Sequence, residues 1–298
     1  MRLAAVDVGS NTVHALVADA VEGRLQDVAH HVEMPELGIA VRETGRIGAA
    51  RTKLALKALE TVLGGARGTG YEHLVAGATA AVREAGDRDR FLAAAAKVAG
   101  APVRLIAEVR EAELSFLGVA SRHAVRSEWL MVDLGGASTE LVGAHGRDIL
   151  VSRTLPIGSG TLAARYLSDP PLPEQRRALR SEAVRALAAA PDFDPSRIVV
   201  TGGTASHLPA LISGKRPPPV ISAQALLGIA ARLDEAPAGE VARRYQLPEP
   251  RVRALRGGVE VLLLVLDWAG LSQLHISHEG LRHGMLLAYL DRGEDWWR

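Results

Sequence analysis

The sequence carries one strand–turn–strand pattern twice, and this repeat limits the possible folds more than any other feature. Val6-Asp7-Val8-Gly9-Ser10-Asn11-Thr12 can be laid on Val132-Asp133-Leu134-Gly135-Gly136-Ala137-Ser138, so that Asp133 lies 126 residues after Asp7. One Asp-x-Gly turn would mean little, but two copies at similar positions in two halves indicate a duplicated domain. We therefore expect two related domains with two phosphate-type loops that face each other across a cleft.

The composition fits a globular protein of this organisation. A chain of 298 residues with 48% hydrophobic residues favours two domains and argues against disorder. Because there is no cysteine, disulfides, Fe–S clusters, thiolate zinc sites and a cysteine nucleophile are excluded. The net charge of +1 does not indicate a nucleic-acid polymer as partner.

Arginine dominates the basic residues. Of 35 lysines and arginines, only Lys53, Lys57, Lys97 and Lys215 are lysines. A coding bias explains such a ratio, and a functional explanation is that guanidinium groups bind oxyanions through two parallel hydrogen bonds. The sequence leaves both explanations open.

No segment resembles an export signal or a membrane span. Asp7 interrupts the apolar run at the N-terminus, and the longest apolar stretch, 261–266, lies between Glu260 and Asp267. That stretch is far shorter than the ~20 residues that cross a bilayer. We expect a cytoplasmic protein without a membrane partner.

The hydrophobic pattern predicts an α/β fold, in which a three-stranded meander is followed by alternating helices and strands. The first half is expected to contain strands at 2–8, 13–19, 25–29, 73–77 and 102–106, and helices at 48–63, 88–98 and 110–122. The second half is expected to contain strands at 128–134, 149–155, 198–201 and 274–277, a strand that begins at Glu140, and helices at 159–167, 174–188, 222–233, 237–245, 251–268 and 280–290.

Two segments are predicted to be connectors. The glycine-rich stretch 64–70 is expected to end a helix as a flexible connector, because it follows a helix rather than the strand that a phosphate loop requires. Segment 215–219, with three prolines, is expected to be a rigid surface linker. We predict an N-terminal domain at 1–122 and a second domain at 123–298, with the C-terminal helix near 280–298 as an element able to pack back on the first.

The position of the two turns indicates what they bind. P-loops and dinucleotide fingerprints join a strand to a helix, whereas each of these turns joins two strands. This arrangement is typical of the actin-like group of phosphate binders, in which a hairpin turn offers backbone N–H and hydroxyl groups to phosphate. The expected fold is therefore α/β with two ribonuclease H-like domains of the actin-like ATPase superfamily. An aspartate beside such a turn can hold hydrated Mg²⁺.

Several segments together resemble the exopolyphosphatase/guanosine pentaphosphatase (Ppx/GppA) family, in its short two-domain form. The resemblance covers nearly the whole chain. It rests on the order and spacing of seven segments: 7–14 (DVGSNTVH), 78–85 (ATAAVREA), 111–119 (EAELSFLGV), 132–141 (VDLGGASTEL), 155–158 (LPIG), 201–205 (TGGTA) and 280–286 (GLRHGML). The Thr-x-x-x-Arg and Glu-Ala-x-Leu segments between the two turns distinguish this family from other actin-like proteins.

The resemblance implies roles for particular residues. Glu111 would be the general base that activates water, Asp133 the main ligand of Mg²⁺ or another divalent cation, and Asp7 and Glu140 further ligands. Arg83 would bind a phosphate next to the scissile one. The residues that would contact phosphate are Gly9, Ser10, Asn11, Thr12, Thr79, Arg83, Gly135, Gly136, Ala137, Ser138, Thr139, Gly202, Gly203 and Thr204.

The sequence departs from the family pattern beside the expected base. Arg110 stands where the first of two adjacent glutamates is common, Glu113 replaces the usual arginine, and Ala137 replaces the third glycine of the second turn. These departures leave substrate preference and rate open.

Three functions are consistent with these residues. The first is an exopolyphosphatase that removes the terminal phosphate of inorganic polyphosphate, with short chains expected because the domains that extend longer relatives do not follow. The second is a guanosine pentaphosphate 5′-phosphohydrolase. The third is a non-catalytic (p)ppGpp or nucleotide sensor, which the departures at Arg110 and Glu113 would favour. The family resemblance also suggests a homodimer.

Overall fold

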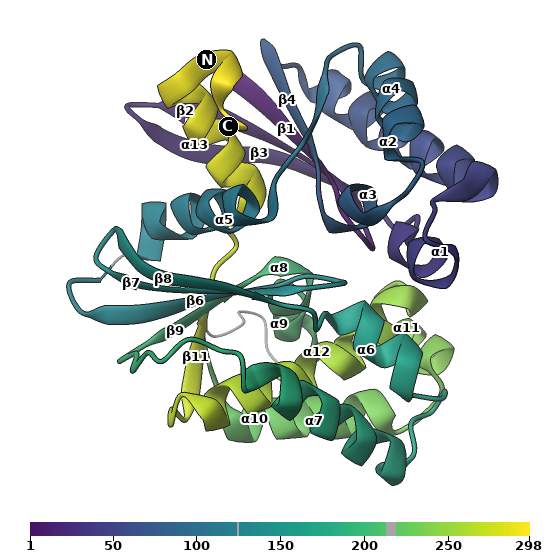
Figure 1. Cartoon of the computed structure of the whole chain (residues 1–298), viewed down its shortest axis with the longest axis vertical. Coiled ribbons are helices and arrows are strands. Elements are labelled where there is room, and N and C mark those ends of the chain that lie inside the picture. The colour runs from purple at the N-terminus through teal and green to yellow at the C-terminus, as the bar shows by residue number, and fades with distance from the viewer. Residues whose placement is uncertain (124, 213–218) are drawn as a thin grey trace. The chain divides into compact units, whose positions relative to one another are not determined.

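The computed structural model describes residues 1–123, 125–212 and 219–298 (Figure 1). These residues form two compact units, which are described separately below. The first unit consists of Met1–Arg122 and Glu279–Arg298, and the second of His123–His278. Most of the predicted linker, residues 215–218, lies outside the described residues. No helix in the described part of the chain is long and apolar enough to cross a membrane.

The first unit is built on a five-stranded sheet with the order β3-β2-β1-β4-β5. Strands β1, β2 and β3 form the predicted antiparallel meander, and β4 and β5 run parallel to β1. The strands are β1 (Arg2–Val8), β2 (Val13–Val21), β3 (Arg24–Glu33), β4 (His73–Ala78) and β5 (Val103–Leu105). The helices are α1 (Leu37–Thr44), α2 (Gly48–Thr69), α3 (Ala80–Glu84), α4 (Arg88–Ala99), α5 (Glu108–His123), α13 (Leu281–Arg292) and the 3₁₀ helix η1 (Gly293–Asp295).

Both faces of this sheet are covered by helices. Successive side chains of a strand point to opposite faces, so the central strand β1 supplies two separate cores. Val6 packs in the core that includes Leu59 of α2 and Phe91 of α4, and Leu3 packs in the core that includes Met285 of α13. The C-terminal helix therefore completes the fold of the first unit.

Helices α5 and α13 touch through their backbones. A Cβ atom added at Gly284 would lie 1.7 Å from the carbonyl oxygen of Leu114, and one at Gly118 would lie 2.2 Å from that of Gly280. Only glycine allows this approach at both positions. The contact fixes the start of α13 against the helix that carries Glu111.

The glycine-rich stretch 64–70 does not form the connector that we expected from the sequence. Helix α2 continues to Thr69 and ends at Gly70, which has a φ of +80°. A Cβ atom added at Gly65 would lie 2.4 Å from Nδ1 of His31 on β3. The glycine lets the helix pack closely on the sheet, and this packing outweighs the low helix propensity of glycine.

The second unit repeats the same sheet and adds one strand. Its order is β10-β11-β9-β6-β7-β8, in which β6, β7 and β8 form the meander and β9 and β11 run parallel to β6. The strands are β6 (Glu128–Leu134), β7 (Thr139–His145), β8 (Asp148–Leu155), β9 (Ile198–Thr201), β10 (Val220–Ser222) and β11 (Gln273–Ile276). The helices are α6 (Ser159–Tyr166), α7 (Pro173–Leu187), α8 (Gly202–Ala205), α9 (Leu208–Leu211), α10 (Ala223–Asp234), α11 (Ala238–Tyr245) and α12 (Glu249–Trp268).

The shared strand order confirms the predicted fold class, because both units have ribonuclease H-like α/β topology. Helix α12 forms the centre of the second core, and Val252, Val259 and Leu262 on it are fully buried. Helix α12 is buried along almost its whole length.

A hydrogen-bond cluster around the partly exposed side chain of Asp27 holds α13 on the sheet of the first unit. Nε2 of His283 lies 2.9 Å from Oδ1 of Asp27 on β3, and Nε2 of His30 lies 2.9 Å from Oδ2 of the same carboxylate. Burial by itself would raise the pKa of Asp27, but the bonds to the two histidines hold it well below its usual range. The ionised carboxylate therefore stabilises the folded state.

Because the folded-state pKa is lowered, this contribution is present above the unfolded-state pKa of about 4 and is lost as the pH falls. We predict that Asp27→Asn lowers the free energy of unfolding by about 1 kcal/mol at neutral pH, a value reduced for the partial exposure of the carboxylate. The difference from wild type should shrink as the pH falls from about 5 to about 2. Chemical denaturation of the full chain measures it, with Asp89→Asn, whose side chain is 96% exposed, as control. A difference that stays constant with pH would contradict this role.

Candidate active site

The two glycine turns have the same backbone construction. In the first unit Val8 pairs with Val13, and the N–H of Gly9 donates to the carbonyl of Thr12 at 2.9 Å. In the second unit Leu134 pairs with Thr139, and the N–H of Gly135 donates to the carbonyl of Ser138 at 3.0 Å. The paired strand ends and the hydrogen-bonded residues of the two turns are thus related by the same offset of 126 residues that the sequence shows.

The first residues of a helix donate a backbone hydrogen bond to each glycine turn. The N–H of Gly38, in α1, donates to the carbonyl of Ser10 at 2.8 Å, and the N–H of Thr161, in α6, donates to the equivalent carbonyl of Gly136 at 2.9 Å. In the second unit the hydroxyl of Ser159 also donates to the carbonyl of Gly135. These bonds occupy the carbonyl oxygens of the turns within the protein. Carbonyl oxygens that pointed at a bound anion would repel it.

Close packing requires glycine next to the second turn. A Cβ atom added at Gly158 would lie 2.3 Å from the backbone nitrogen of Ala137. The hydroxyl of Thr139, one of the predicted phosphate contacts, is buried and donates instead to the carbonyl of Ile157. Thr139 therefore supports the turn through its side chain.

Two of the predicted metal ligands face each other across β6 and β7. Asp133 and Glu140 are paired positions of these antiparallel strands, and the hydroxyl of Ser138 donates to Oε1 of Glu140 at 2.6 Å. Asp7, the third predicted ligand, belongs to the first unit, where its Oδ2 lies 3.8 Å from Nη1 of Arg282. Within the described residues, no group of three acidic or histidine side chains forms a metal site by itself.

The loop after β9 lies directly against Asp133. Gly202 has a φ of +95°, and a Cβ atom there would lie 2.6 Å from the carbonyl oxygen of Leu134 and 2.9 Å from Oδ1 of Asp133. Gly202, Gly203 and Thr204 begin α8, so the predicted loop is the first turn of a short helix. The structure thus brings this loop together with Asp133 in one unit.

Glu111 and Arg83, the predicted base and phosphate ligand, form an ion pair in the first unit. Nη1 of Arg83 lies 2.9 Å from Oε2 of Glu111 and also donates to the carbonyl of Ile106 at 2.9 Å. Arg83 belongs to α3, which begins after Thr79 at the end of β4, while Glu111 lies in the first turn of α5. The pair is largely buried, with 20% and 12% of the two side chains exposed. An arginine has five N–H donors, so binding Glu111 does not exhaust its capacity.

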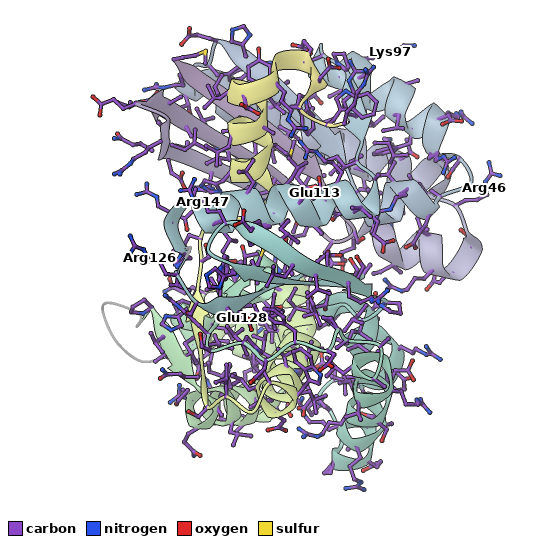
Figure 2. All side chains as sticks on the ribbon, turned by 60° about the vertical axis from the view of Figure 1, so that its left-hand side comes forward. Arg46, Lys97, Glu113, Arg126, Glu128 and Arg147 are labelled. Carbon is purple, nitrogen blue, oxygen red and sulfur yellow. The ribbon has the colours of Figure 1, made fainter. Side chains whose placement is uncertain are left out.

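The departures at Arg110 and Glu113 compensate each other. Nη1 of Arg110 lies 3.0 Å from Oε2 of Glu113, and its Nη2 donates to the carbonyl of Trp296 at 2.7 Å. Glu113 projects from α5 (Figure 2). The pair ties α5 to the C-terminal end of the chain and leaves the Arg83–Glu111 pair intact, which weakens the argument for a non-catalytic sensor.

Sequence reasoning missed Arg251, a buried cation on α12. Arg251 is only 5% exposed. A Cβ atom added at Gly203 would lie 2.5 Å from Nη1 of Arg251. Burial lowers its pKa to about 10. Burial, followed by the charge of Arg251, lowers the pKa of the neighbouring His207 to about 4. In the described chain no carboxylate pairs with Arg251, so this buried charge lacks the partner that such groups normally have. Its only sequence signal is an arginine inside a predicted apolar helix.

Sequence reasoning also missed Arg282 at the start of α13. It lies within the 280–286 segment that resembles the family, but its pairing with Asp7 joins residues from opposite ends of the chain. Arg282 places a positive charge beside Asp7, which offsets part of the negative charge that Asp7 could offer to a metal ion.

Comparison with known proteins shows where this arrangement belongs. The model of the Ppx/GppA phosphatase family matches residues 16–293. The chain belongs to the Ppx/GppA phosphatase family. It is 29% identical to exopolyphosphatase 1 of Mycobacterium leprae, over 99% of this chain and 91% of that protein. It is 35% identical to exopolyphosphatase 2 of Mycobacterium tuberculosis, over 70% of each chain.

Solved structures agree with this assignment. The Ppx/GppA family member from Aquifex aeolicus matches with a TM-score of 0.81 and 27% identity, over 99% of both chains. An exopolyphosphatase from Cytophaga hutchinsonii, at 22% identity, shares the fold with a TM-score of 0.87 over 98% of both chains. The Ppx/GppA assignment made from the sequence is confirmed, and the chain is accordingly a phosphoric anhydride hydrolase.

Arg251 can be tested as a functional residue through stability, with Arg256 on the same helix as a matched control. Arg256 is equally buried, but it binds Asp169 at 2.8 Å and donates to the carbonyls of Leu233 and Ala236. We predict that Arg251→Met leaves the free energy of unfolding unchanged or raises it by up to about 1 kcal/mol, because an unpaired buried charge is removed. Arg256→Met should lower it by about 2–3 kcal/mol, because the carbonyls of Leu233 and Ala236 lose a buried donor and the partly exposed Asp169 loses its cation. Urea denaturation measures the free energy of unfolding of both variants. Equal destabilisation by both would contradict a functional role for Arg251.

Proposed function

We propose that this Ppx/GppA member is an exopolyphosphatase that hydrolyses the terminal phosphoanhydride bond of inorganic polyphosphate. The observation that carries the proposal is the pair of matching glycine turns, each with its carbonyl oxygens bound by a helix start. Backbone amides and hydroxyls in such turns bind phosphate oxygens without regard to what the phosphate is attached to. The exopolyphosphatases among the relatives support polyphosphate as the substrate, and guanosine pentaphosphate is the alternative to be tested beside it.

Glu111 is proposed to be the general base. Its carboxylate would accept a proton from the attacking water while the water oxygen forms a bond to the terminal phosphorus and the bond from that phosphorus to the bridging oxygen breaks. The products would be orthophosphate and a chain shortened by one phosphate. Arg83 holds the carboxylate through Nη1, and its remaining donors are suited to a phosphate oxygen. Phosphoryl transfer needs such positioning and charge neutralisation more than a covalent nucleophile.

In the second unit, Gly136–Ser138, the first turn of α8 and Arg251 are the proposed phosphate contacts. The buried guanidinium of Arg251 adjoins Gly203, so an anion at this loop would supply the missing counter-charge. A hydrogen bond between ions in a partly buried place contributes about 1.5–3 kcal/mol. Arg251 would therefore strengthen binding of substrate rather than take part in proton transfer.

A magnesium ion fits the donors that the structure provides. Mg²⁺ usually takes one or two carboxylates together with water and substrate phosphate, so a site of three protein ligands is not needed. Asp133 and Glu140 are the residues proposed to hold it. A bound ion would neutralise charge on the phosphate oxygens.

The test of the base is phosphate release from polyphosphate, guanosine pentaphosphate and ATP. We predict that Glu111→Gln reduces kcat for polyphosphate by about 10²–10⁴-fold, because the proton acceptor is lost. Glu113→Gln, on the same helix, should retain kcat within about twofold, since its partner is Arg110. Release from no substrate by wild type would refute the proposed function, and undiminished release by Glu111→Gln would refute the base.

The metal role makes a separate prediction. Asp133→Asn should raise the Mg²⁺ concentration that gives half-maximal activity by about tenfold or more, because one anionic ligand becomes neutral. Glu128→Gln is the control, as Glu128 is exposed at the other end of the same strand, β6 (Figure 2). Tryptophan fluorescence during Mg²⁺ titration, without substrate, gives a second readout. An Asp133→Asn protein with an unchanged Mg²⁺ requirement would contradict the assignment.

A further inference from the structure

A cationic groove runs between α2 and α4 on the first unit. It has a volume of about 810 Å³. Five basic side chains line it, three from α2 and two from α4: Lys53, Lys57, Arg67, Arg90 and Lys97. The two helices lie side by side on one face of the sheet (Figure 1), and Lys97 lies at the periphery of the unit (Figure 2). We call this surface the α2–α4 groove.

The spacing of the basic residues makes a continuous stripe. Lys53 and Lys57 are one helical turn apart, and Arg67 continues the same side of α2, so that the three span about 21 Å of helix. Arg90 and Lys97 are seven residues apart on α4 and therefore lie on one side of that helix. Three of the four lysines in the whole sequence are in this groove.

The acidic residues of the groove offset little of this charge. Only Glu60 and Asp87 are acidic. Both oxygens of Asp87 already accept backbone hydrogen bonds, from Ile47 at 2.8 Å and Gly48 at 3.0 Å, so this carboxylate caps α2. In the described part of the chain, Lys53, Lys57, Arg90 and Lys97 form no ion pair with a carboxylate. The groove thus presents an uncompensated positive charge to solvent.

The lining of the groove favours polyphosphate over a nucleic acid. No aromatic side chain lines it, so it offers no surface on which bases could stack. The lysine ammonium groups are compact charges that bind phosphate without a required direction. A flexible polyanion made only of phosphates has no bases to stack, and its phosphates can bind these ammonium groups.

The groove opens at the same sheet edge as the first glycine turn. Strand β4 runs parallel to β1 and ends beside it, and Asp87 follows Arg83 by four residues. The bonds from Ile47 and Gly48 to Asp87 bring the start of α2 to this edge as well. One end of the groove therefore lies at the edge of the sheet that also carries the Gly9–Thr12 turn, at which the end of a chain would be bound.

We propose that the α2–α4 groove binds the internal phosphates of a polyphosphate chain whose terminal phosphate is being hydrolysed. The inference rests on the proposed function, and it favours longer chains than the short ones that we expected from the sequence.

The test compares a groove variant with a control of equal charge change. The groove variant is Lys53→Gln, Lys57→Gln and Lys97→Gln combined. The control combines Arg24→Gln, Arg126→Gln and Arg147→Gln, three exposed arginines outside the groove, two of which are labelled in Figure 2. We expect the groove variant to raise KM for long-chain polyphosphate about tenfold, the size expected from three exposed charge pairs. Its kcat, and its KM for tripolyphosphate, should stay as in wild type.

Each contrary result has a distinct meaning. An unchanged KM for long chains, an equal rise for tripolyphosphate, or the same rise in the control would each overturn the groove and leave the proposed function standing. Direct binding of long-chain polyphosphate by the Glu111→Gln protein, with and without the groove substitutions, separates the two proposals. If wild type hydrolyses no polyphosphate, yet the groove substitutions still remove this binding, the α2–α4 groove is a polyphosphate-binding surface and only the proposed hydrolysis fails. Loss of binding to a single-stranded RNA instead of polyphosphate would overturn the choice of ligand.

Discussion

The hydrogen bonds between a helix start and the carbonyl oxygens of each glycine turn are the constraint on which the rest of the site depends. Gly38 binds the carbonyl of Ser10, and Thr161 binds the equivalent carbonyl of Gly136. A hairpin turn has both donors and acceptors, and an anion is attracted only where the acceptors point elsewhere. The same solution occurs in both units, on helices that follow the third strand of each meander. The duplication therefore preserved a local electrostatic arrangement together with the strand order.

The pairing of the charged residues around the turns is explained by their burial. Arg83 with Glu111, and Arg282 with Asp7, are pairs in which a partly buried carboxylate has a cation beside it. Arg251 is the exception, because its guanidinium is buried without a carboxylate partner in the described chain. Such a charge is costly to the fold and is readily explained if the partner is a substrate phosphate. The second unit would then supply binding energy, and the first unit the proton acceptor.

The sequence predicted what depends on local pattern. Strand β1 was predicted with its observed bounds, and the two turns, the doubled α/β fold and the family followed from short segments. The pairing of Asp7 with Arg282 and the burial of Arg251 depend on contacts between distant segments, which periodicity does not encode. Helix α2 was predicted too short because its glycines break a helix locally, whereas packing of Gly65 on His31 extends it to Thr69. Glu111, Arg83 and the metal ligands remain predictions of role, although the structure places Glu111 and Arg83 in contact.

A crystal structure of Glu111→Gln with Mg²⁺ and polyphosphate tests the two turns as phosphate-binding elements most directly. We expect the oxygens of bound phosphate to accept hydrogen bonds from backbone N–H groups of Ser10–Thr12 and of Gly136–Ser138, and the guanidinium of Arg251 to bind a phosphate. Phosphate bound elsewhere, with these amide groups unused, would show that the two turns are not the phosphate-binding elements.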